Sequence, residues 1–235
     1  RWRRAITSAA RRPRKCGPPS PGRDSVDVVR AFVQRHGLSP TLTALVLSAL
    51  TVLMAVRFIG LTEAPPGFYV DEAAIAAQII CVRTTGADAD GNPWPLFADV
   101  LGGGQVSPPT LYLGALWTAL LGDGVASFRS LAGAAGVVIL ISLALVTWRL
   151  GAQPLAVPAI LLIAASSPWL FHLLRVFWDP IIAAATWAAA LAAYVFASRS
   201  AVLSGRVMGW LAFALLSAAA VYGYPPLRRG IASQP

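Results

Sequence analysis

Residues 41–59 read TLTALVLSALTVLMAVRFI, an apolar segment of 19 residues followed directly by Gly60. As an α-helix, a segment of this length extends about 28 Å, which matches a hydrocarbon core of about 30 Å. It is longer than the apolar region of a cleaved signal peptide, and about forty residues precede it. We therefore predict that residues 41–59 form the first membrane span.

The composition is typical of an integral membrane protein. Hydrophobic residues make up 57% of the chain and charged residues only 12%, whereas about a quarter of the residues in soluble domains are charged. Four further apolar segments of spanning length follow, at residues 126–148, 155–174, 181–197 and 207–224. The predicted fold is an all-α, multi-pass helical bundle of about five spans.

Residues 60–125 differ from the rest because they contain seven of the ten acidic residues. Turn signals at 90–93 (Asp-Gly-Asn-Pro) and at 102–104 (three glycines) predict one large loop that contains short helices. Within it, residues 110–121 are apolar but would extend only about 18 Å as a helix. This segment either crosses the membrane as a sixth span or lies at the interface.

Positive charge in the loops does not distinguish these two alternatives. The interfacial arrangement brings the acidic and basic residues of 71–72 and of 175–179 to one side of the membrane. We prefer it because an active site needs its charges on one side.

The basic residues gather at the N-terminus. Residues 1–36 hold ten Arg or Lys against two Asp, which leaves +8 of the chain's net charge of +9. By the positive-inside rule this tail is cytoplasmic, at the plasma membrane, and the large loop is external. Its prolines predict disorder, and because no recognition motif is present, no nucleic-acid partner is predicted. The remaining domains are the membrane domain, residues 37–228, and a short tail, 229–235.

The stretch 65–72, PPGFYVDE, places two carboxylates, Asp71 and Glu72, directly after the first span. They begin a predicted helix, 71–82, where the N-terminal dipole favours negative charge. Capping of the helix is the alternative interpretation, although it accounts for one acid better than for two. Carboxylates at the mouth of apolar helices usually serve substrate, ion or proton chemistry.

Two further stretches carry charge at helix ends. Residues 175–179, RVFWD, place Arg175 and Asp179 four positions apart, close enough to pair if the turn is helical. Residues 222–228, YGYPPLR, supply Tyr224 and Arg228, which suit a sugar ring and a phosphate. For both stretches the alternative is an ordinary membrane-interface belt of aromatic and basic residues. No His or Cys cluster has metal-ligand spacing, so no zinc site is predicted.

Over residues 40–228 the chain resembles the GT-C superfamily of integral-membrane glycosyltransferases, especially bacterial relatives of protein O-mannosyltransferases and of the aminoarabinose lipid A transferase. The similarity rests on the Asp-Glu pair in the first external loop. Three further stretches are similar in order and spacing: SPPTLY at 107–112 with FRSL at 128–131, SPW at 167–169 with the Arg and Asp of 175–179, and YGYPPLR at 222–228.

The resemblance implies transfer of a sugar from a polyprenyl-phosphate-linked donor to a hydroxyl of a protein, glycan or lipid acceptor. Asp71 would be the general base, and Glu72 would orient the acceptor or hold a divalent cation, the one cofactor considered. Arg175 and Arg228 would offset charge on the leaving phosphate, Asp179 would orient Arg175 or contact the sugar, and Tyr224 would bind substrate. The loop 87–106 would exclude water.

The family continues through further helices beyond Arg229, so we expect a fragment of a longer enzyme. The alternative is an inactive remnant or a non-catalytic scaffold subunit. A secondary transporter is a third interpretation, which the position of the charges at the ends of the spans disfavours.

Overall fold

The computed structural model describes residues 40–100, 104–152 and 155–223. The chain divides into two compact units, Arg1–Thr43 and Ala44–Pro235, and the second is described here. The predicted basic tail, 1–36, and the predicted site residues Tyr224 and Arg228 lie outside the described residues.

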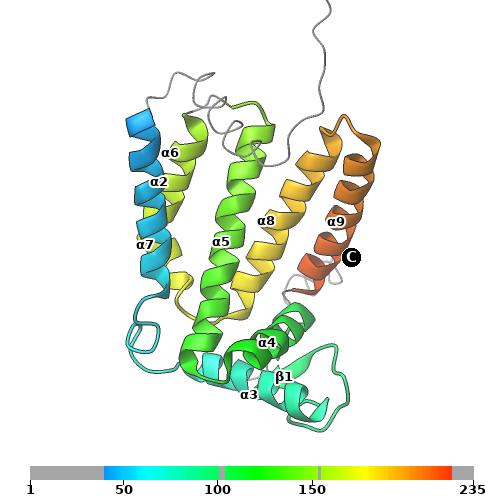
Figure 1. The fold of residues 1–235 in the computed structure, drawn as a ribbon. Coiled ribbons are helices and arrows are strands. Elements are labelled where there is room, and N and C mark those ends of the chain that lie inside the picture. The colour runs from blue at the N-terminus through cyan, green and yellow to red at the C-terminus, as the bar shows by residue number, and fades with distance from the viewer. Residues whose placement is uncertain (1–39, 101–103, 153–154, 224–235) are drawn as a thin grey trace, which may run out of the picture. The chain divides into compact units, whose positions relative to one another are not determined.

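The described chain is mostly helical, and three helices are long and apolar enough to cross a membrane by length and composition. They are α5 (Val125–Arg149), α8 (Asp179–Ser198) and α9 (Leu203–Tyr222). Their positions agree with three of the predicted spans, and α8 packs against both α5 and α9 (Figure 1). Leucines such as Leu145, Leu191 and Leu215 are exposed along them, as expected for surfaces that face lipid.

The other two predicted spans have shorter helices. Helix α2 (Pro40–Ala55) is followed by a 3-10 turn, Val56–Phe58, and the segment predicted as one span at 155–174 contains two helices. These are α6 (Ala156–Ser166) and α7 (Pro168–Leu173). The break occurs because Pro168 has no N–H to continue α6, while Ser167 is extended and its Oγ accepts a hydrogen bond from Leu170 N at 3.4 Å. The count of five spans stays a prediction.

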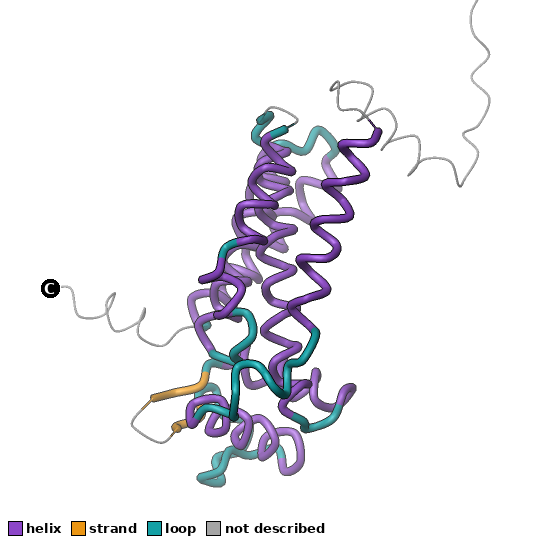
Figure 2. Tube along the Cα trace, turned by 90° about the vertical axis from the view of Figure 1, so that its left-hand side faces the viewer, coloured by secondary structure: helices purple, strands orange, loops and turns teal. Residues whose placement is uncertain are grey.

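The large predicted loop contains α3 (Val70–Thr85), β1 (Ala98–Val100), β2 (Gly104–Val106) and α4 (Pro108–Leu121). These elements gather at the end of the long helices where α5 and α8 begin (Figures 1 and 2). Both short helices were predicted. The two antiparallel strands, with Ala98 opposite Val106, were not, so the described chain is mainly α rather than all-α.

The main apolar core lies at this same end, where α3 and α4 pack against the starts of α5 and α8. Phe128 of α5 sits between two other phenylalanines, with ring centroids 6.2 Å from Phe68 and 5.4 Å from Phe177. Ile79 and Leu111 are fully buried beside them. Packing therefore fixes the backbone around the acidic pair.

Gly209 provides a test of the packing between α8 and α9. A Cβ at this position would lie 2.8 Å from the Cβ of Ala197 and 2.9 Å from its Cα, so the helix backbones must separate. We expect Gly209→Ala to cost about 1–3 kcal/mol of stability, measured by thermal unfolding in detergent. Gly124→Ala is the control, because nothing lies within 4 Å of its added Cβ. Equal melting temperatures for the two variants would contradict the close approach.

The loop after α3 is organised by Asp88, whose carboxylate accepts three hydrogen bonds. The donors are the Asn92 side-chain amide at 2.9 Å, the Asn92 backbone N–H at 2.8 Å and the Asp90 backbone N–H at 3.1 Å. These bonds, led by the one from the Asn92 side chain, hold the pKa of Asp88 below its usual value.

A lowered pKa means that Asp88 stabilises the folded chain when ionised. Its contribution is complete above the ordinary Asp pKa of about 3.9 and is lost as the pH falls through the lowered folded-state value. We expect Asp88→Ala to lower the melting temperature at pH 6, and the difference from wild type to shrink as the pH approaches 3. A difference that is independent of pH would contradict this role for the carboxylate.

Candidate functional site

The acidic pair occupies the first turn of α3, after the extended residue Tyr69. The Glu72 Oε2 atom accepts a hydrogen bond from the backbone N–H of Tyr69 at 3.1 Å, as the third residue of a helix does in a capping box. The capping interpretation therefore holds for Glu72. It does not apply to Asp71, which is exposed.

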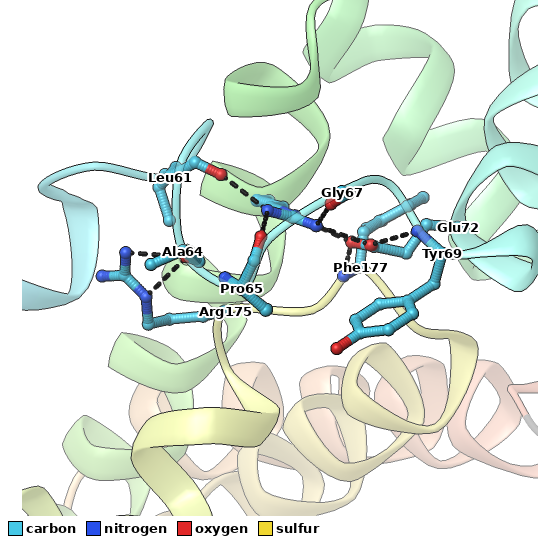
Figure 3. A network of polar contacts seen from close by, with 9 residues as sticks. Leu61, Ala64, Pro65, Gly67, Tyr69, Glu72, Arg175 and Phe177 are labelled. Atoms are coloured by element: carbon cyan, nitrogen blue, oxygen red, sulfur yellow. Dashed lines mark hydrogen bonds and ion pairs between the residues drawn. The ribbon is translucent and has the colours of Figure 1, made fainter.

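Glu72 also forms a buried ion pair with Arg129 of α5, and the two side chains are 1% and 0% exposed. Arg129 donates from Nε to Oε1 at 3.0 Å and from Nη2 to Oε2 at 2.8 Å. The backbone N–H of Phe177 donates to Oε1 at 2.8 Å (Figure 3). Both carboxylate oxygens are thus fully engaged by protein donors.

The remaining donors of Arg129 hold the chain between the first apolar helix and α3. Nη1 donates to the carbonyls of Leu61 and Pro65, each at 2.8 Å, and Nη2 donates to Gly67 O at 2.5 Å. The sequence indicated Arg129 only as part of a motif and not as a site residue. The signal that could have identified it is a cation near the start of a long apolar helix.

Arg175 binds the same connecting segment from the other side, and it is only 6% exposed. Its Nε and Nη2 donate to Ala64 O at 3.1 and 2.8 Å (Figure 3). Its other bonds go to the carbonyls of residues 56, 57, 59 and 60. Burial, and then the charge of Arg129, lower its pKa, yet a guanidinium remains charged in proteins.

Asp179, which begins α8, has different partners from those expected. Its Oδ1 accepts hydrogen bonds from Ser107 Oγ at 2.6 Å and from Thr110 Oγ1, and Oδ2 is buried without a partner among the described residues. The expectation that Asp179 pairs with Arg175 and orients it is wrong for this structure. The reason is that residues 176–178 are not helical, so a spacing of four does not bring the two side chains together.

A pocket of about 420 Å³ opens beside the start of α3. One wall consists of residues 69–72, and the other of His172, Leu173 and residues 176–178. Asp71 lines this pocket and, within the described residues, makes no hydrogen bond or ion pair. The structure therefore brings Asp71 and residues 176–178 to one pocket, while the predicted site residues Arg175 and Asp179 are not among the residues that line it.

A divalent cation between Asp71 and Glu72 stays a prediction that this arrangement does not favour. No group of three or more His, Cys, Asp or Glu side chains placed to hold a metal occurs in the described part of the chain. Both oxygens of Glu72 face N–H donors, and a metal would need them released.

Comparisons of the chain with protein-family models, with curated proteins and with solved structures gave no match.

Removing one partner of the buried pair leaves the other charge uncompensated. We expect Glu72→Ala to cost about 3–5 kcal/mol of stability, measured by thermal or denaturant unfolding in detergent.

The matched control is Asp123→Ala, because Asp123 pairs with Arg83 at 2.6 Å with side chains 42% and 26% exposed. An exposed pair of this kind contributes at most about 1 kcal/mol. If Glu72→Ala and Asp123→Ala reduce the stability by the same small amount, the Glu72–Arg129 pair does not stabilise the fold.

Proposed function

We propose that the chain is a membrane glycosyltransferase that moves a sugar from a polyprenyl-phosphate-linked donor to an acceptor hydroxyl. The observation that carries the proposal is that the two residues of the acidic pair have different environments. Glu72 is buried and neutralised by Arg129, while Asp71 is exposed and lines the pocket. The helix start thus presents the carboxylate of Asp71, which has no partner among the described residues, to a pocket at the end of apolar helices.

In the proposed reaction, Asp71 accepts the proton of the acceptor hydroxyl as that oxygen attacks the anomeric carbon of the sugar. The bond between that carbon and the phosphate oxygen breaks, and the configuration inverts. A general base must lie within hydrogen-bond reach of the proton that it takes. The exposed carboxylate of Asp71, which has no partner among the described residues, meets this requirement better than Glu72 does.

The surroundings of Asp71 suit such a substrate. Tyr69 and Trp178 line the same pocket and are 45% and 43% exposed, so their rings are available to a sugar or an isoprenoid chain. The neighbouring helices α5 and α8 are candidate membrane spans. A lipid-linked donor would keep its chain in the bilayer and its phosphate at the pocket.

The test is sugar transfer in membranes that contain the full chain, with a panel of radiolabelled polyprenyl-phosphate hexoses as donors. We expect Asp71→Asn to reduce transfer by a factor of about 10² or more, since a general base contributes about 10²–10⁴. Glu63→Gln is the control, because Glu63 is exposed in the preceding segment and does not line the pocket. Unchanged transfer in Asp71→Asn would refute the assignment.

A non-catalytic scaffold is the second candidate, and one observation favours it. Glu72, Arg129 and Arg175 direct their polar groups to protein partners, as structural residues do. Absence of transfer by the wild-type chain with every donor, together with unchanged stability in Asp71→Asn, would favour this candidate over the enzyme.

A further inference from the structure

The buried arginines near this end of the helices already donate hydrogen bonds to protein groups. Arg129 and Arg175 donate to Glu72 and to backbone carbonyls. Arg57 is fully buried, and its terminal nitrogens donate to Leu53 O at 2.6 Å and to Ala165 O at 2.7 Å. Turning any of these guanidinium groups toward a ligand would leave buried carbonyls without donors, which is unfavourable.

His172 is different. It lies on the short helix α7, its side chain is exposed, and its imidazole makes no hydrogen bond within the described part of the chain. It lines the same pocket as Asp71. Among the described residues of that pocket, it is the basic side chain.

We propose that His172 binds the phosphate of the ligand that occupies this pocket. Imidazole donates an N–H hydrogen bond in its neutral form and two when it is charged, and a bond to an ionised phosphate is among the stronger ones in proteins. The walls of the pocket also include the apolar side chains of Leu173, Val176 and Phe177.

This inference rests on the proposed function, and it moves phosphate binding from Arg175 to His172. Arg175 then acts through the backbone, because it fixes residues 56–64. His172 and Asp71 would contact different substrates of this reaction. The imidazole would bind the phosphate of the donor, and the carboxylate would contact the hydroxyl of the acceptor.

The experiment measures equilibrium binding of three probes to the full chain in nanodiscs: citronellyl phosphate, citronellol and inorganic phosphate. The first two differ only in the phosphate group. We expect His172→Gln to weaken binding of citronellyl phosphate about tenfold, the value of one hydrogen bond to a charged group, and to leave citronellol binding unchanged. His172→Lys, which restores a cation, should recover most of the affinity.

Arg199→Gln is the matched control, because Arg199 is an exposed cation at the C-terminal end of α8, whereas the pocket lies at its start. Unchanged binding of citronellyl phosphate in His172→Gln, or an equal loss in Arg199→Gln, would overturn the proposal. If His172→Gln lowers the melting temperature, the result for His172→Lys distinguishes the outcomes. Recovered binding of citronellyl phosphate in His172→Lys supports the proposal, and lost binding in a stable His172→Lys variant overturns it.

Asp71→Asn separates this inference from the proposed function, since it should abolish transfer and keep phosphate binding. If Asp71→Asn retains sugar transfer while His172→Gln loses binding of citronellyl phosphate, Asp71 is not the general base, and the role of His172 in phosphate binding is supported. Inorganic phosphate that competes as well as citronellyl phosphate would likewise support His172, yet it would identify the ligand as free phosphate and contradict the lipid-linked donor.

Discussion

The structure around the pocket depends on the buried ion pair between Glu72 and Arg129. Removing two charges from water is expensive, and attraction between them offsets this cost only when the remaining donors and acceptors are also satisfied. In this structure they are satisfied. Glu72 accepts hydrogen bonds from the backbone N–H groups of Tyr69 and Phe177, and Arg129 donates hydrogen bonds to three backbone carbonyls. One pair therefore joins the loop before α3, the start of α5 and the 175–179 turn.

The buried arginines also supply hydrogen-bond donors to backbone carbonyls. The segment 56–67 has little regular hydrogen bonding of its own, and carbonyls at the end of an apolar bundle need donors. Arg129 and Arg175 supply them over the whole segment. The cations thereby hold the backbone in place. Asp71 and His172 line the pocket, and their side chains make no hydrogen bond within the described part of the chain.

The two acids of the Asp-Glu motif are adjacent, yet they have different environments. Consecutive residues of a helix point in directions about 100° apart, so when Glu72 faces the core, Asp71 faces the pocket. Packing of Phe128 between Phe68 and Phe177 fixes this rotation of the helix start. The motif combines an anchor with a free carboxylate, which is the arrangement that a general base requires.

By itself, the sequence determined what depends on local composition and helix length: the places of α5, α8 and α9, which are long and apolar enough to cross a membrane, and the helix that starts at the acidic pair. The Glu72–Arg129 pair and the contact of Asp179 with Ser107 in place of Arg175 were decided by tertiary structure. The partners in each of these contacts are distant in sequence. Which buried donor meets which acceptor depends on how the helices pack, and hydrophobic periodicity along one chain does not contain that information.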